Sequence, residues 1–274
     1  MIARVRLAGV LLAALLLLSG CLTGGPTTPT ATPTASGTDG GVPDAGELRN
    51  ETLTAMANVS AYTAVQHVTE RNRTDNQTVQ VVYALNRSTH RLAAHRRTTS
   101  AETTTTVDRY VIDKTLYQRR ASFQQTYGTA WIKRDIADGF GTTWHLYDQL
   151  WRYRFMLDNA SLSTVETDTI NGTPVYVVET SVDTDEMNVA LREALDFPPG
   201  TATAVSDNTS VHATFWIDQN TRLPVVVERH VTGPVARQEG RVPFERTITT
   251  RLTYETVSVR LPANASDATL VESS

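Results

Sequence analysis

Apolar and polar residues alternate along most of the chain after about residue 60. In the segment 79–85 every second position is apolar or aromatic, namely Val79, Val81, Tyr83 and Leu85. Successive side chains of a strand point to opposite faces, so this period of two predicts a strand with one buried face. The same pattern, or a β-rich composition, predicts further strands at 103–112, 115–119, 164–170, 173–182, 210–217, 225–232 and 248–261. We expect roughly ten strands in all.

Two short turns connect predicted strands. Asn171-Gly172 separates 164–170 from 173–182, and this dipeptide supplies the positive φ values of a type I′ hairpin turn. Asp113-Lys114 is expected to form a similar tight turn before the strand 115–119. Pro174 cannot donate a ladder hydrogen bond, so we expect it on a free edge or beside its turn. These signals indicate antiparallel hairpins.

Three segments carry the three-to-four-residue period of a helix. They are 47–58, 143–157, and a segment that begins after Asp183 and ends before Phe197-Pro198-Pro199-Gly200. Asp183 is a suitable N-cap, with Glu186 three residues later as a capping-box partner. Strands and helices do not alternate strictly, so a parallel α/β sheet is excluded in favour of an α+β fold.

The helix predicted at 143–157 is apolar on nearly all sides. The stretch 140–155 holds six of the 19 aromatic residues of the chain, and a helix of this kind is buried on several sides. It could fill the core, or it could line a cavity that is open to a ligand. As candidate lining residues we take Trp144, Tyr147, Trp151 and Phe155, together with Trp131 from outside this helix.

The N-terminus has the pattern of an export signal. Arg4 and Arg6 precede an apolar run from Leu7 to Leu18, which is too short to span a bilayer comfortably. The following Leu18-Ser19-Gly20-Cys21 resembles the lipobox of secreted lipoproteins, in which the signal is cut before the cysteine and a lipid is attached to its sulfur. The alternative is an ordinary secretory signal with a chance cysteine. Cys21 is the only cysteine of the chain, so it has no partner for an intramolecular disulfide.

Residues 22–46 have the composition of a flexible linker. Seven Thr, six Gly, four Pro and one Ser fill 18 of its 25 positions, without an aromatic residue, so it cannot bury enough apolar surface to fold. As a flexible coil it would reach roughly 25–30 Å. The predicted organisation is therefore a signal peptide at 1–20, a lipid-anchored Cys21 with its linker to residue 46, a folded domain at 47–262 and a flexible tail at 263–274. This places the protein on the extracytoplasmic face of the cell membrane.

Charge and motifs exclude several function classes. Removal of the signal leaves 23 basic and 29 acidic residues, a balance that argues against nucleic-acid binding. Helical or strand ligand spacing is absent among the six histidines, and the acidic run at 183–186 lacks the EF-hand glycine and glutamate. Nucleophile-elbow, P-loop and dinucleotide motifs are absent too. We therefore expect no cofactor, no metal and no catalytic residue.

Nine Asn-X-Ser/Thr triplets could accept N-linked sugar if the source glycosylates exported proteins. They begin at Asn50, Asn58, Asn72, Asn76, Asn86, Asn159, Asn171, Asn208 and Asn264. Chains rich in threonine also produce such triplets by chance.

The segment Trp216-Ile217-Asp218-x-x-Thr221-x-Leu223-Pro224 resembles a hairpin signature of the lipoprotein-carrier (LolA-like) superfamily, which includes mycobacterial lipid-binding lipoproteins. The segments Val59-Ser60-Ala61-Tyr62, Val175-Tyr176-Val177-Val178 and Thr253-Tyr254-Glu255-x-Val257 point the same way. The whole resembles haloarchaeal lipoproteins of unknown function. The resemblance implies an open antiparallel half-barrel, helices over its concave face, and an apolar cavity between them.

Two functions are compatible with these features. The first is a membrane-anchored lipoprotein that sequesters a lipid or another apolar ligand. The second is a surface module that binds protein or acts as a sensor, with the half-barrel as its scaffold. A hydrolase would require a Ser, a His and an Asp that converge in space. The protein partner and the identity of the ligand are not encoded in any motif.

Overall fold

One open sheet forms the body of the structure. The computed structural model describes residues 42–72, 76–196, 209–237 and 240–271, which belong to one unit that spans Gly41–Ser274. Within those residues twelve strands form a sheet in the order β12-β6-β5-β4-β3-β2-β1-β11-β10-β9-β8-β7. Neighbouring strands are antiparallel, except that β12 pairs parallel with β6. The predicted α+β half-barrel is thereby confirmed.

The strands are β1 (Ala61–Asn72), β2 (Asn76–Asn86), β3 (Arg91–Thr99), β4 (Thr104–Ile112), β5 (Thr115–Arg119), β6 (Trp131–Asp135), β7 (Ser161–Ile170), β8 (Thr173–Val182), β9 (Ser210–Asp218), β10 (Pro224–Arg237), β11 (Gly240–Thr253) and β12 (Thr269–Leu270). The helices are α1 (Ala45–Asn58), α2 (Phe123–Tyr127), α3 (Phe140–Tyr147), α4 (Gln149–Asp158) and α5 (Thr184–Ala194), with a short 3₁₀ turn at Ala263–Ala265.

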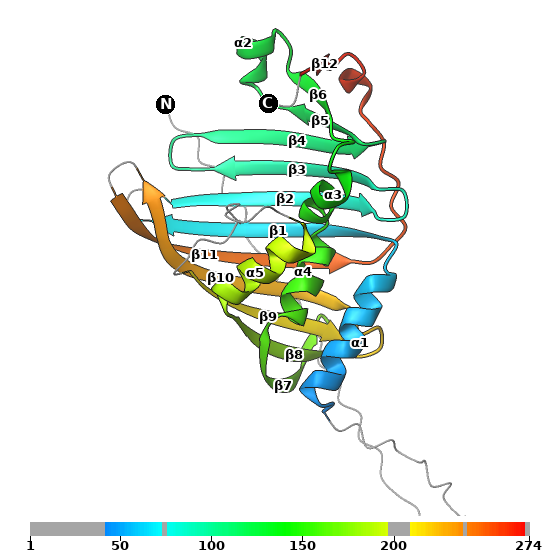
Figure 1. Cartoon of the computed structure of the whole chain (residues 1–274), viewed down its shortest axis with the longest axis vertical. Coiled ribbons are helices and arrows are strands. Elements are labelled where there is room, and N and C mark those ends of the chain that lie inside the picture. Colours follow the sequence, from blue (N-terminus) through cyan, green and yellow to red (C-terminus); the bar gives the residue numbers. More distant parts are fainter. Residues whose placement is uncertain (1–41, 73–75, 197–208, 238–239, 272–274) are drawn as a thin grey trace, which may run out of the picture. The chain divides into compact units, whose positions relative to one another are not determined.

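Helices cover one face of the sheet. The connection from β6 to β7 runs from near one edge of the sheet to the opposite edge. It contains α3 and α4, which therefore lie across the sheet between these strands (Figure 1). The helix α5 connects β8 to β9 over the same face, and α1 packs against α4. In the described part of the chain no helix is both long and apolar enough to cross a bilayer.

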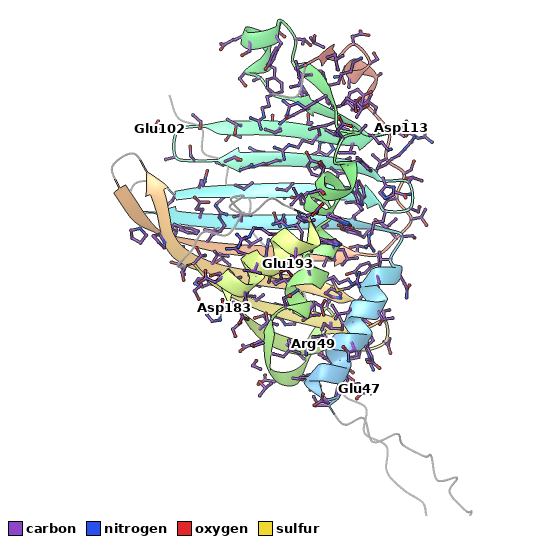
Figure 2. The ribbon with its side chains drawn as sticks, in the orientation of Figure 1. Glu47, Arg49, Glu102, Asp113, Asp183 and Glu193 are labelled. Atoms are coloured by element: carbon purple, nitrogen blue, oxygen red, sulfur yellow. The ribbon has the colours of Figure 1, made fainter. Side chains whose placement is uncertain are left out.

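Local sequence signals form the turns and caps that they predict. Asn171 and Gly172 have φ values of 50° and 84° in the β7–β8 hairpin, and Pro174 lies beside this turn. Asp113 and Lys114 also have positive φ in the turn from β4 to β5. The side chain of Asp183 accepts hydrogen bonds from two backbone amides in the first turn of α5, as expected for an N-cap. Asp113 and Asp183 are labelled in Figure 2.

The predicted helix at 143–157 is wrong in its continuity, because it is two helices. Asp148 has extended backbone dihedrals, ends α3 and caps α4 with its carboxylate, which accepts hydrogen bonds from the amides of Leu150 and Trp151 at 3.0 and 3.1 Å. The break lies in the middle of the aromatic stripe, so the aromatic residues before it belong to α3 and those after it belong to α4. The aromatic residues of this stretch therefore do not form one continuous surface.

Two apolar clusters lie on opposite faces of the sheet. The main core lies between the sheet and the helices, and it contains Tyr62, Leu150 and Phe215. The second cluster includes Ala93 and Tyr110, whose strand neighbours Leu92, Ala94 and Val111 belong to the main core. Residues 257–268 supply part of the second cluster, and β12 follows them at the edge of the sheet. The last predicted strand ends at Thr253 rather than near Leu261.

Candidate functional site

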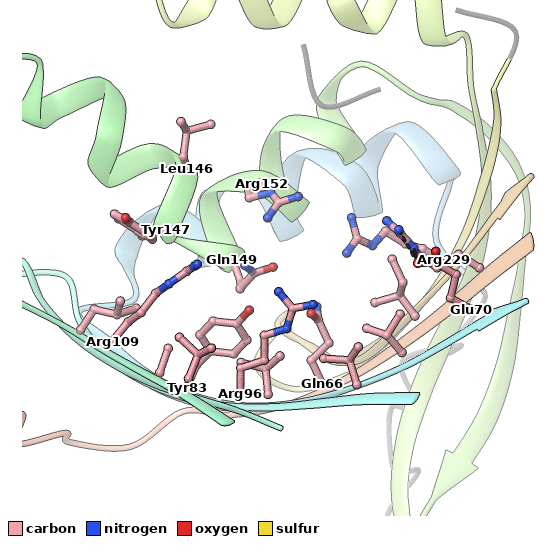
Figure 3. Close-up of a pocket in the computed structure, with 18 of the residues that line it drawn as sticks. Gln66, Glu70, Tyr83, Arg96, Arg109, Leu146, Tyr147, Gln149, Arg152 and Arg229 are labelled. Atoms are coloured by element: carbon pink, nitrogen blue, oxygen red, sulfur yellow. Dashed lines mark hydrogen bonds and ion pairs between the residues drawn. The ribbon is translucent and has the colours of Figure 1, made fainter. Parts of the chain in front are cut away.

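A cavity of about 660 Å³ lies between the strands of the helix-covered face and the helices α3 and α4. The strands curve beneath it, and side chains enter it from both the sheet and the helices (Figure 3). Volumes of a few hundred to about 1,000 Å³ are typical of sites for small molecules and cofactors. The cavity is therefore large enough to hold a ligand as well as solvent.

The floor of the cavity is apolar because of strand alternation. Val68 on β1 lies opposite Val79 on β2 and opposite Ile248 on β11. Val81 extends this surface by one step along β2, and other apolar lining residues are Leu92, Ala94, Val107 and Leu146. Every strand residue of this set follows the period of two that places it on the face beneath the helices.

Five arginines surround this floor. Arg96 and Arg109 lie on β3 and β4, on one side of the floor; Arg229 and Arg246 lie on β10 and β11, on the other side; Arg152 descends from α4. Figure 3 shows the heads of Arg96, Arg152 and Arg229 turned toward the same space. The cavity is thus amphipathic rather than apolar as the resemblance implied.

One carboxylate partly balances this charge. Glu70 is the single acidic residue of the cavity lining, and it accepts hydrogen bonds from Nε and a terminal nitrogen of Arg246 at 3.0 and 2.5 Å. The other four arginines form no ion pair with any described residue. The Nε atom of Arg229 is inaccessible to solvent and has no hydrogen-bond partner in the described part of the chain. The lining therefore has a formal excess of four positive charges.

The positive charges meet around Tyr83. Burial raises the pKa of the Tyr83 hydroxyl, while three nearby arginines act in the opposite direction: Arg152, Arg109 and Arg229. Burial also lowers the pKa of Arg152, and the charge of Arg229 lowers it further. A guanidinium group stays protonated inside a protein, so the like charges of these arginines repel one another in the cavity.

Uncharged polar groups complete the site. Gln149 is 4% exposed, and its Oε1 atom is buried without a hydrogen-bond partner among the described residues. Gln66 instead donates from Nε2 to Thr250 Oγ1 at 3.2 Å, and the Tyr153 hydroxyl donates to the same oxygen at 2.5 Å. Gln149 is therefore a lining residue with an unsatisfied acceptor, whereas Gln66 is held by its neighbours.

The predicted lining residues are dispersed in the structure. Tyr147 lines the cavity. Trp144 is buried in the main core, where its ring stacks with Phe140 at a centroid distance of 6.1 Å. Trp151 stacks between His145 and Phe155, at centroid distances of 4.7 and 5.3 Å. Neither Trp151 nor Phe155 is among the lining residues, although Gln149 and Arg152 of the same helix are.

Trp131 lies in the second cluster, on the face opposite the helices. Its ring packs near Tyr110 at a centroid distance of 5.9 Å, and 5% of the residue is exposed. It was predicted as a lining residue, but its position on β6 directs it away from the helix-covered face. Cys21 lies outside the described residues.

The cavity arginines were missed by the sequence reasoning. Each is a single charge in a separate strand or helix, and only long-range pairing brings them together. The usable signal was parity: Arg96 lies two residues after Ala94 and four after Leu92, so it shares their buried face. In this strand, a charged residue at a position that alternation assigns to the apolar face indicates that the side chain lines a cavity.

One serine–histidine contact exists within the described ranges. Ser210 Oγ and His212 Nε2 are 3.1 Å apart on the exposed part of β9. The described carboxylates form no hydrogen bond or ion pair with His212. The contact therefore does not make the triad that a hydrolase would need.

A sequence model for a family of unknown function, DUF7537, matches residues 6–220. The chain belongs to this family. No curated protein matches it. The DUF7537 match covers β1 to β4, which supply most of the cavity floor, as well as α3 and α4; β11 lies beyond it.

Several solved structures have a similar fold. Lipoprotein LppX of Mycobacterium tuberculosis shares 15% identity with a TM-score of 0.46, covering 78% of this chain and 99% of LppX. LprF of Mycobacterium bovis shares 14% identity with a TM-score of 0.46, covering 82% and 100%. A LolA-superfamily protein of Nitrosomonas europaea shares 9% identity with a TM-score of 0.25, covering 80% and 94%.

Proposed function

We propose that this protein is a membrane-anchored, extracytoplasmic lipoprotein that binds a lipid or lipid-like molecule in the cavity beneath α3 and α4. The observation that carries the proposal is the contiguous apolar floor of Val68, Val79, Val81 and Ile248 inside a cavity of about 660 Å³. The protein acts by sequestration rather than by catalysis.

The energetics of the floor suit an extended apolar chain. Burial of each CH₂ group stabilises a complex by about 0.8 kcal/mol, so a chain of several methylenes is held without specific polar contacts. The floor lies in the middle of the sheet, where strands on both sides fix its position. Such a preformed surface reduces the ordering cost of binding.

A cavity-filling substitution tests the binding site. Val107 lines the cavity from β4, so Val107→Trp places an indole in the space that a ligand needs. Titration of the purified protein with Nile red, followed by fluorescence, should show saturable binding that Val107→Trp weakens at least about tenfold, the equivalent of ~1.4 kcal/mol.

Val82→Trp is the matched control. Val82 is 40% exposed and lies next to Val81 on β2, with the opposite parity. This variant should bind Nile red like the parent protein, and thermal unfolding should verify that both variants fold. Equal binding by all three proteins would contradict the cavity as the site. A stoichiometric protein partner in a chain that binds no apolar probe would support the scaffold alternative.

The anchor is tested separately. Cys21→Ser removes the sulfur that would carry the lipid, and Cys21 is the only cysteine. In membrane fractionation of expressing cells the parent protein should sediment with membranes, and the variant should appear in the soluble fraction. Intact mass should show a lipid-sized increase in the parent alone. An unmodified Cys21 in the mature protein would refute the anchor.

A further inference from the structure

We infer that the cavity selects amphiphiles with an anionic head group of the phosphate or sulfate type, which the four arginines that lack a carboxylate partner hold above the apolar floor. The inference rests on the proposed function and names the chemistry of its ligand. The arginines are Arg96, Arg109, Arg152 and Arg229.

The first argument is charge. Four guanidinium groups share one partly enclosed space, and none has a carboxylate partner among the described residues. Like charges in a site of reduced dielectric repel one another more strongly than in water. An anion placed among them removes this repulsion and gains attraction to several groups at once. A neutral head group does neither.

The second argument is geometry. The arginines reach the same space from β3, β4, β10 and α4, so their planar donor groups approach from different directions. Guanidinium forms two parallel hydrogen bonds with the oxygens of phosphate or carboxylate. A tetrahedral head group with three terminal oxygens offers acceptors in several directions, whereas a planar carboxylate presents two in one plane. This arrangement favours the tetrahedral anion.

The third argument is the unpaired Gln149. Gln149 lines the cavity, and its buried Oε1 atom has no partner in the described residues. Such an acceptor is costly unless a ligand or water satisfies it. Half a turn of the amide presents the NH₂ group instead. Gln149 can therefore accept from a protonated phosphate oxygen or donate to an ionised one. Tyr83, which lines the cavity from β2, adds a hydroxyl donor.

The apolar floor and the cationic groups lie in one cavity. Arg229 is the register neighbour of Ile248, and Arg96 is the register neighbour of Val81. A bound molecule therefore contacts methyl groups and guanidinium groups within a short distance. This combination fits a single molecule with a charged head and an apolar chain better than either part alone.

The test compares three amphiphiles with the same chain and different heads: dodecyl phosphate, dodecyldimethylamine oxide and dodecyltrimethylammonium. Inorganic phosphate is the fourth ligand. Isothermal titration of the purified protein should give the tightest binding for dodecyl phosphate, at least about tenfold tighter than for the amine oxide. Inorganic phosphate should bind more weakly than dodecyl phosphate because it lacks the chain.

Two substitutions and two matched controls assign the effect to the cavity. Arg152→Gln and Arg96→Gln should each weaken dodecyl phosphate binding about tenfold, with little change for the amine oxide. Arg154→Gln and Arg97→Gln make the same charge change at positions of the same elements that do not line this cavity, and they should leave both affinities unchanged. Thermal unfolding verifies the fold of each variant.

The outcomes separate this inference from the proposed function. Equal affinity for all three heads, with competition by Nile red, would overturn the anionic preference and leave the apolar site intact. Dodecyl phosphate and inorganic phosphate binding equally tightly, with loss in Arg152→Gln, would support the anion site and overturn the lipid-binding proposal. Equal losses in the cavity variants and in the controls that do not line the cavity would overturn the assignment to these arginines.

Discussion

At the scale of single residues, burial governs the behaviour of the ionisable groups around α3 and α4. His145 stacks on Trp151 at a centroid distance of 4.7 Å, and its Nδ1 atom is buried without a partner among the described residues. Burial lowers the pKa of His145. The negative charge of Asp148 opposes this shift, and the positive charges of Arg87 and His90 add to it. The folded protein therefore favours the neutral imidazole.

This shift predicts a pH dependence of stability. The unfolded chain takes up a proton on His145 near pH 6.5, whereas the folded chain does so only at a lower pH. Between these two values the unfolded state binds more protons, so stability falls as pH is lowered. The contribution is present in full above about pH 6.5 and is lost as pH falls to the folded pKa.

Urea unfolding of the parent and of His145→Gln from pH 7.5 to 5 should reveal this contribution. The glutamine variant should show a shallower loss of free energy of unfolding, because it lacks the group that titrates. Identical slopes for the two proteins would assign the acid sensitivity to other groups.

At the scale of elements, Asp148 connects the helix break to the sheet. Its carboxylate accepts hydrogen bonds from the Tyr62 hydroxyl at 2.9 Å and from Arg87 Nε at 2.8 Å, in addition to the amides of α4. Arg87 also donates to the carbonyl oxygen of Met56, in the last turn of α1, and to that of Val59, directly after the helix. Asp148, with Arg87 directly after β2, thus connects α1, α4 and β1.

The substitution Asp148→Ala should therefore be much more costly than the loss of an ordinary cap. It removes the cap of α4 and leaves Arg87 and Tyr62 without their partner in a buried site, which should lower the free energy of unfolding by about 3–5 kcal/mol. Asp183→Ala removes the cap of α5 alone and should cost about 1 kcal/mol. Urea denaturation measures both. Similar losses for the two variants would show that Asp148 acts only as a cap.

The hairpins and caps were predictable because their signals are local. Asn171-Gly172 determines its turn through its own φ preferences, and Asp183 caps α5 through amides two and three residues away. The break at Asp148 was also locally encoded, since aspartate is a favoured N-cap. The aromatic periodicity on both sides of it obscured this signal.

At the scale of the whole molecule, charge is distributed unevenly. The chain has a formal charge of −4, while the described cavity lining alone has an excess of four positive charges. Composition reports the sum and therefore hides the contrast. Strand parity places Arg96 on the same face as Leu92 and Ala94, but the gathering of five arginines in one cavity could not be read from sequence, because it depends on which strands pair. The location of Trp131 on the opposite face depends on strand pairing in the same way. The pattern within a strand shows which residues share a face. Which of the two faces the helices cover is determined only by how the strands pair.

The pairing of β1 with β11 has a consequence for the order of folding. Val68 and Ile248 are register neighbours at the centre of the cavity floor, although most of the chain separates them in sequence. Contacts between distant residues form slowly, because loop closure must precede them. The floor is therefore incomplete until β11 has joined β1. We therefore expect ligand binding to require the pairing of β1 with β11, and a bound molecule that contacts both strands should slow their separation.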